Sequence, residues 1–233
     1  MPWSKKAVIF ITTNSQKVKE LQALAEDYAA ELPSQLQSQS QSQSQSQSQS
    51  RRLNDGITIL HINYDYPELQ LDEIDAVARA SAKYIREQES AGIGIRDSFF
   101  IEDSGLYIPA LNGFPGPYSA FIFRTIGNEG ILRLMSGKKG DERKATFKTV
   151  IAFCESAQRS PVLFAGTVNG NIAEKIRGSS GFGYDPIFEV ESTDTGTGTG
   201  KRKTLAEMSM EEKNTVSHRS RAFRKLLDYL SPL

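Results

Sequence analysis

The sequence has few of the residues that mark several common classes of protein. It contains one cysteine, Cys154, and two histidines, and its 28 basic side chains balance 28 acidic ones. A single cysteine excludes an internal disulfide and a cysteine-rich metal cluster, which indicates a reducing compartment. Zero net charge gives no bulk field to attract nucleic acid or an acidic membrane surface. No apolar run approaches the ~20 residues of a membrane span. We therefore expect a cytoplasmic protein with no nucleic-acid or membrane partner.

Two low-complexity segments have too few apolar side chains to join a core. Residues 37–50 alternate strictly between Gln and Ser, and residues 193–200 are built from Thr, Asp and Gly. Such segments cannot offset their ordering entropy by burying apolar surface. The sequence therefore predicts one domain over residues 1–233, with disordered insertions at about 34–52 and 192–202.

The rest of the sequence alternates between short apolar runs and stretches with helical periodicity. Strands are expected at residues 7–11, 57–62, 99–101, 145–153 and 162–172, of which the last two form a long hairpin. Helices are expected at residues 15–28, 74–85 and 209–230. This order predicts an α/β fold with a mixed sheet.

The segment from Thr12 to Lys17 lies where a predicted strand passes into a predicted helix. A helix N-terminus carries unpaired N–H groups and a partial positive charge, so it suits a phosphate. The alternative is an ordinary capped helix with Asn14 or Ser15 at the N-cap, which the absence of Walker-type glycines favours. The candidate phosphate-binding residues are Thr12, Thr13, Asn14, Ser15, Gln16 and Lys17.

Acidic side chains follow two of the predicted strands. Residues 102–105, with the sequence EDSG, come directly after one strand, and Glu68 lies after another. Open α/β sheets bind ligands at the carboxyl ends of their strands. A carboxylate there can hold Mg²⁺ or accept a proton from water, and Glu68 could complete a Mg²⁺ site with Asp103. The alternatives are an acidic turn and a solvated loop residue.

Residues 178–185 combine three glycines with two aromatic side chains and an aspartate. Glycines permit close backbone approach, and Phe182 offers a face on which a base can stack. The alternative is a flexible connection that buries an aromatic residue.

The segment from Lys213 to Arg219 contains donors suited to a nucleotide. Lys213 could contact phosphate, while His218 and Arg219 could donate to a base carbonyl; the alternative is a solvated helix face. In one unbroken helix Lys213 and His218 would point about 140° apart. The functional interpretation therefore predicts a break between Asn214 and Ser217, with Ser217 as the N-cap of a second helix and a capping box from Ser209 to Glu212.

In this order, six strings resemble the inosine triphosphate pyrophosphatase family. They are TTNSQK (12–17), YPELQ (66–70), EDSGL (102–106), LNGFPGPYSAF (111–121), GFGYDPIF (181–188) and AEMSMEEKNTVSHR (206–219). The string TIGNEGIL (125–132) is similar to the archaeal branch of that family. The resemblance covers most of the chain outside the two insertions.

The resemblance implies a Mg²⁺-dependent enzyme that hydrolyses inosine, deoxyinosine and xanthosine triphosphates to monophosphate and pyrophosphate. The implied fold is an elongated mixed β-sheet flanked by helices, with two lobes enclosing a central nucleotide-binding cleft. The implied assembly is a homodimer, with residues 114–121 near the dimer contact. The alternatives are a Maf-like nucleotide pyrophosphatase of other specificity, a nucleotide-binding module without catalysis, and an RNA-binding protein that uses the basic C-terminal end.

The resemblance also implies roles for individual residues. Asp103 would be the general base and would hold the metal together with Glu68. The implied substrate site comprises Ser104; Thr12, Asn14, Lys17 and Lys213 at the phosphates; Phe182 stacked on the purine; and Asp185, His218 and Arg219 at its edge. Thr13, Ser15, Gln16, Gly183 and Tyr184 complete the predicted site.

Two residues depart from the family pattern. Thr13 replaces a usual glycine, and its Cβ is expected to hinder the approach of a phosphate. Ala78 stands where many members carry a phosphate-binding lysine, and Arg79 and Lys83 are candidates to compensate.

Overall fold

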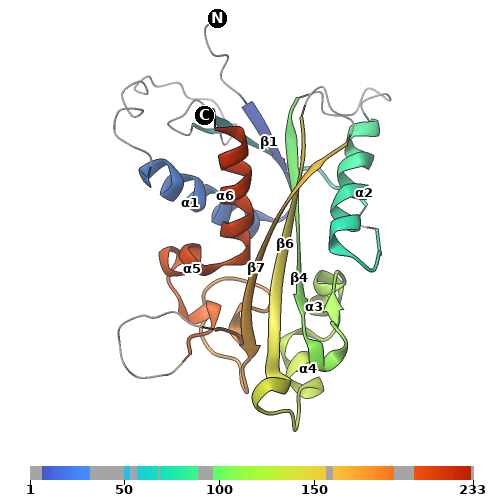
Figure 1. The fold of residues 1–233 in the computed structure, drawn as a ribbon, viewed down its shortest axis with the longest axis vertical. Coiled ribbons are helices and arrows are strands. Elements are labelled where there is room, and N and C mark those ends of the chain that lie inside the picture. Colours follow the sequence, from blue (N-terminus) through green and yellow to red (C-terminus); the bar gives the residue numbers. More distant parts are fainter. Residues whose placement is uncertain are drawn as a thin grey trace, which may run out of the picture.

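The structure is a computed structural model that describes residues 7–31, 50–52, 57–67, 69–88, 97–155, 160–191 and 202–231 (Figure 1). Most of the two expected insertions, and Glu68, lie outside these residues. Residues 50–52, which we placed in the first insertion, instead form strand β2 (Ser50–Arg52). None of the helices in the described ranges has the length and apolarity to cross a membrane.

The centre of the molecule is a mixed sheet of eight strands in the order β2-β3-β1-β4-β6-β7-β8, with β5 beside β4. The remaining strands are β1 (Ala7–Ile11), β3 (Thr58–Ile62), β4 (Phe99–Tyr107), β5 (Pro115–Gly116), β6 (Lys144–Cys154), β7 (Val162–Ile172) and β8 (Phe188–Val190). Strand β1 pairs parallel with β3 and β4, whereas the other pairs are antiparallel. The predicted α/β class, the mixed sheet and the long β6–β7 hairpin are confirmed.

Helices cover both faces of the upper part of this sheet in Figure 1. Helices α1 (Ser15–Glu31) and α6 (His218–Leu230) lie on one face, and α2 (Ile74–Glu87) lies on the other. Strand β1 explains why: Val8 and Phe10 pack with α1 and α6, while Ile9 and Ile11 pack with α2. A strand with apolar side chains on both faces must be covered twice, as its continuous apolar run predicts.

A second lobe forms where β4, β6 and β7 extend beyond these helices (Figure 1). Helices α3 (Ser119–Thr125) and α4 (Gly127–Leu134) pack there around a separate core that includes Phe147, Tyr184 and Phe188. Neither helix was predicted from the sequence. Phe121, Phe123, Ile126 and Leu134 are exposed, so the apolar residues of this segment do not form the single buried stripe by which a helix is recognised.

The C-terminal segment forms two helices, as predicted. Helix α5 (Met210–Val216) begins with the capping box of Ser209 and Glu212, and Ser217 separates it from α6. The Ser217 hydroxyl accepts a hydrogen bond from the Ser220 amide at 3.1 Å. Because of this break, the side chains of α6 do not follow the helical repeat of α5.

A glycine on β7 allows α6 to lie directly on the sheet. A Cβ on Gly166 would collide with the His218 carbonyl oxygen and the Ala222 amide of the first turns of α6. The missing side chain therefore lets the backbone around His218 and Arg219 approach the sheet closely.

The prediction for β4 was wrong in one respect. We expected the strand to end at Ile101 with the acidic cluster beyond it, but β4 runs on to Tyr107. Glu102, Asp103 and Ser104 therefore lie in mid-strand, paired with β6 through Ile151, Val150 and Thr149 respectively. Because successive side chains point to opposite faces, Glu102 and Ser104 share the face of α1 and α6, and Asp103 lies on the face of α2.

Candidate active site

A cleft of about 470 Å³ lies between the two lobes. It is bounded by the junction of β1 with α1, residues 64–66, β4, α3, residues 182–185 and the start of α6. The predicted residues that line it are Thr12, Thr13, Asn14, Gln16, Lys17, Ser104, Phe182, Gly183, Tyr184, Asp185, His218 and Arg219. These residues come from sequence strings far apart in the chain, and the fold brings them together in one cleft. The predicted residues Ser15, Asp103 and Lys213 do not line it.

Asp103 lies in an adjoining pocket of about 190 Å³. This pocket shares Lys17, Ser104, Ala120 and Arg124 with the cleft, so the two form one continuous lining. Leu69 and Gln70 also line it. Glu68, the second predicted metal ligand, lies outside the described residues. Within the described ranges no group of three or more His, Cys, Asp or Glu side chains is arranged to hold a metal ion.

The N-terminus of α1 is capped by the side chain of Asn14. Its Oδ1 accepts hydrogen bonds from the amides of Gln16 at 2.9 Å and Lys17 at 3.2 Å. The Thr12 hydroxyl in turn accepts the Asn14 amide at 3.1 Å. Asn14 is thus the N-cap, and these two helix amides already have an acceptor. Any phosphate held here depends on the side chains that line the cleft or must displace the cap.

Thr13 sits at the cleft without backbone strain. Its side chain is exposed. Its φ is not positive, because among the described residues Asn112 is the only non-glycine residue with a positive φ. The conformation at Thr13 therefore does not require glycine.

Glu102 anchors Lys17 at the floor of the cleft. Lys17 Nζ contacts Glu102 Oε2 at 2.8 Å and donates to the Glu102 carbonyl oxygen at 2.7 Å. Arg219 Nε lies 3.4 Å from Glu102 Oε1. Burial alone would raise the pKa of Glu102, but Arg219 and Lys17 outweigh burial and hold that pKa well below its usual range. The carboxylate is therefore ionised and tied to two cations.

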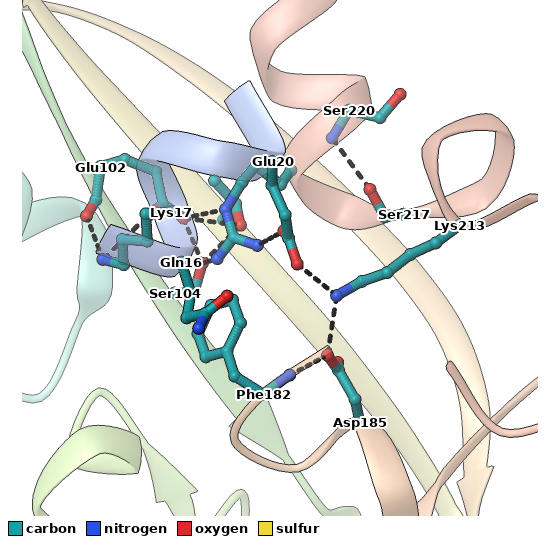
Figure 2. A network of polar contacts seen from close by, with 12 residues as sticks. Gln16, Lys17, Glu20, Glu102, Ser104, Phe182, Asp185, Lys213, Ser217 and Ser220 are labelled. Atoms are coloured by element: carbon teal, nitrogen blue, oxygen red, sulfur yellow. Dashed lines mark hydrogen bonds and ion pairs between the residues drawn. The ribbon is translucent and has the colours of Figure 1, made fainter. Parts of the chain in front are cut away.

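Glu20 on α1 extends these contacts of Glu102, Lys17 and Arg219 to Lys213 on α5 (Figure 2). Its carboxylate contacts Lys213 Nζ at 2.5 Å and also binds the guanidinium of Arg219. Lys213 Nζ contacts Asp185 Oδ2 at 2.7 Å as well. Three cations and three carboxylates thus form one balanced set, which we call the charge network: Lys17, Glu102, Arg219, Glu20, Lys213 and Asp185.

The structure places Lys213 between two carboxylates. Its side chain is only 5% exposed and lies between Glu20 and Asp185, with Nζ 5.5 Å from the centre of the Phe182 ring. It therefore lies beside Phe182 and does not line the open cleft, and its predicted contact with a phosphate stays a prediction.

Asp185 lines the cleft, but its carboxylate is bound within the protein. Its Oδ2 accepts the Phe182 amide at 2.8 Å in addition to contacting Lys213. A Cβ on Gly181, whose φ is +73°, would collide with this carboxylate. Burial raises the pKa of Asp185 against the opposing effect of Lys213. Asp185 thus fixes the 181–185 turn that presents Phe182, whereas we had predicted that it reads the base.

Aromatic side chains line the end of the cleft beside α6. Cζ of the Arg219 guanidinium lies 5.2 Å from the centre of the Phe182 ring. The rings of His218 and Phe147 stack, with their centres 4.6 Å apart and their planes 11° from parallel. Burial, and then the neighbouring Arg219, lower the pKa of His218 well below its ordinary value, so the imidazole is neutral at pH 7. His218 Nδ1 is buried without a hydrogen-bond partner among the described residues. A buried polar atom without a partner is costly, which favours a hydrogen bond from water or a ligand at this atom.

Several residues at the cleft were missed by the sequence analysis. They are Tyr64, Asp65, Tyr66, Ser119, Ala120, Phe123, Arg124 and Phe147. Phe147 reads as an ordinary strand residue, and the residues of α3 belong to a helix that was not predicted.

The two proposed substitutes for a lysine at position 78 are not at the site. Ala78 is a fully buried residue of α2, on the side of the helix that packs against the sheet. Arg79 donates to the Pro161 carbonyl oxygen at 3.3 Å, and Lys83 pairs with Glu87 at the surface. Neither lines the cleft or the Asp103 pocket, so that prediction was wrong.

The charge network predicts a specific cost for removing Glu20. In Glu20→Gln, Arg219 and Lys213 lose a shared counter-charge in a buried environment, and breaking buried pairs in this way costs about 3–5 kcal/mol. Chemical denaturation at pH 7 measures this loss. Glu129→Gln, which removes a carboxylate from an exposed pair with Arg133, is the control and should change stability little.

The same network predicts acid sensitivity. The pKa values of Glu20 and Glu102 are lower in the folded protein than the ordinary value of 4.5. Their contribution to the free energy of unfolding is therefore present above that pH and is lost as the pH falls below it. Wild-type stability should therefore decline below about pH 4.5, with a shallower decline in Glu20→Gln. Equal slopes in the two proteins would show that Glu20 carries no such linkage.

Comparisons with known proteins agree with this arrangement. The sequence profile of the Ham1 family matches residues 8–229. The dITP/XTP pyrophosphatase of Methanopyrus kandleri is 45% identical over 174 residues, which cover 75% of this chain and 84% of that protein. The corresponding protein of Thermococcus kodakarensis is 43% identical and covers 75% of this chain and 85% of its own.

Solved structures give the same result. The Ham1 protein of Staphylococcus aureus has a TM-score of 0.65 at 26% identity, covering 97% of this chain and 98% of its own. The HAM1 protein of Coxiella burnetii has a TM-score of 0.66 at 26% identity, again covering 97% and 98%. The predicted family resemblance is confirmed, and this chain belongs to the Ham1 family.

Proposed function

We propose that this protein hydrolyses damaged purine nucleoside triphosphates, such as ITP, dITP and XTP, to the monophosphate and pyrophosphate. The observation that carries the proposal is the continuity of the cleft. An aromatic wall at Phe182 and His218, the lysine of the first α1 turn and the Asp103 pocket follow one another along a single lining. The naming of the archaeal relatives as dITP/XTP pyrophosphatases supports the same substrate class.

Base selection is assigned to His218. A neutral imidazole has one donor and one acceptor, and a proton on the orphaned Nδ1 pairs with the 6-oxo group of hypoxanthine or xanthine. Adenine presents a donor at that position, and an unpaired buried donor costs about 1–3 kcal/mol. Arg219 was also predicted to read the base, but it already binds Glu20 and Glu102 and supports Phe182. We propose that guanine, which shares the 6-oxo group, is excluded by fit around its 2-amino group.

The chemistry is assigned to Asp103. Its carboxylate accepts a proton from water, the water oxygen forms a bond to the α-phosphorus, and the bond from that phosphorus to the bridging oxygen breaks. Pyrophosphate leaves with the electron pair. The side chain is buried, 7% exposed, in the pocket that opens onto Lys17 and Ser104, so a triphosphate in the cleft reaches it from one side.

A divalent cation, Mg²⁺, is part of this proposal. The Asp103 carboxylate is the hard oxygen donor that Mg²⁺ prefers, and one or two protein carboxylates with substrate phosphates suffice for such a site. Asp103 and Glu68 would hold the ion, which when bound neutralises charge on the phosphates. Leu69 and Gln70, next to Glu68 in sequence, line the Asp103 pocket, which supports this pairing.

We also propose a homodimer that works in the cytoplasm, with a nucleotide and no nucleic acid or membrane as its partner. Phe121 on α3, Ile126 between the two helices and Leu134 on α4 are exposed, which supports an apolar contact there. The buried thiol of Cys154 is consistent with a reducing compartment.

A nucleotide panel with Mg²⁺ tests the proposed reaction. ITP, dITP and XTP should release pyrophosphate in one step, with ATP and GTP far slower because of the base contacts. Release of successive single phosphates would contradict the proposal. A preference for other nucleotides would favour the Maf-like alternative, and binding without turnover would favour a module without catalysis.

Asp103→Asn tests the assigned base. The amide cannot accept the proton, so turnover of dITP should fall by at least about 100-fold, the range expected for general-base catalysis. Affinity for dITP, measured by calorimetry, should remain within a few-fold of wild type. Asp141→Asn, at an exposed carboxylate away from the cleft, is the control. Near-normal turnover of Asp103→Asn would remove Asp103 from the mechanism.

A further inference from the structure

Arg124 on α3 lies where the nucleotide cleft meets the Asp103 pocket. It lines both, as do Lys17, Ser104 and Ala120. Lys17 comes from α1 and Arg124 from the second lobe, so the two cations approach the junction from different lobes. Arg124 was not among the predicted site residues.

The charge network leaves little positive charge for a triphosphate. Lys17, Arg219 and Lys213 are each in contact with carboxylates of the network, whose six members balance. A substrate with several phosphate charges therefore gains little net attraction from these buried groups.

Arg124 is the exception at this junction. Its side chain is exposed and makes no ion pair or hydrogen bond with another residue of the described ranges. A guanidinium is always charged near neutral pH and presents two parallel donors that match phosphate oxygens. Arg124 thus supplies at the junction the unneutralised cation that the buried network does not.

We propose that Arg124 binds the β- and γ-phosphates of the substrate and neutralises the pyrophosphate as it leaves, an inference that rests on the function proposed above. With the base at Phe182 and His218 and the α-phosphorus at Asp103, the remaining phosphates extend into the part of the lining that Arg124 shares with the Asp103 pocket. Arg124 takes the place that we had considered for Arg79 or Lys83.

Two product inhibitors separate this role from a general effect on the cleft. Inorganic pyrophosphate carries the leaving phosphates, whereas dIMP carries the base and the α-phosphate alone. In Arg124→Gln, KM for dITP and the inhibition constant for pyrophosphate should each rise roughly 10- to 100-fold, the range of a lost charge-assisted contact. The inhibition constant for dIMP should stay within about twofold, because dIMP makes no contact that Arg124 provides.

Two further variants complete the test. Arg124→Lys retains a point charge without the forked geometry and should recover part of the pyrophosphate affinity. Arg133→Gln, at an exposed arginine on the neighbouring helix α4, should behave as wild type. Because Arg124 is exposed, Arg124→Gln is expected to keep the thermal midpoint of wild type.

Either of two outcomes overturns the inference. One is an unchanged KM and pyrophosphate affinity in Arg124→Gln. The other is an equal loss of dIMP and pyrophosphate affinity, which would indicate a distorted cleft. A wild-type protein that releases no pyrophosphate from dITP would contradict the proposed function itself, whereas calorimetric titration of pyrophosphate into wild type and Arg124→Gln still tests the phosphate contact.

Discussion

The charge network is the interaction on which the site depends. It joins α1 through Lys17 and Glu20 to β4 through Glu102, and then to the C-terminal helices through Arg219 and Lys213. Charges buried in a protein interior are stable only when they are paired and hydrogen-bonded. The six groups therefore require these elements to meet in one arrangement. Figure 2 shows Lys17, Glu20, Glu102, Asp185 and Lys213 of this network close together.

The balance within the network separates two tasks. The buried groups are neutral as a set and hold Phe182 and the 181–185 turn in place, so they shape the end of the cleft that suits a purine. The groups outside the network, Asp103 and Arg124, lie at the junction with the second pocket, where phosphate chemistry is proposed. Rigid base recognition and adaptable phosphate binding are thus placed in different parts of one lining.

The sequence predicted most where the signal is local. The buried strand β1, the Asn14 cap of α1 and the break before α6 follow from apolar runs, capping residues and helix geometry within a few positions. It failed where a residue is explained only by distant partners. Glu102 is tolerated in mid-strand because Lys17 and Arg219 neutralise it. Lys213 and Asp185, from separate segments, form an ion pair that neither local sequence indicates. Arg124 was not predicted because helix α3 was not predicted: the apolar residues of α3 are partly exposed and do not follow a helical pattern of burial.

A double-mutant cycle between two members that are not paired with each other tests most directly whether the network acts as a unit. Glu102→Gln leaves one cation in excess, Lys213→Met leaves one carboxylate in excess, and the double variant is balanced again. We predict that the double variant loses less free energy of unfolding than the two single variants lose in sum. The difference should exceed about 0.5 kcal/mol in chemical denaturation at pH 7. Losses that add within that margin would show independent pairs and contradict the central claim.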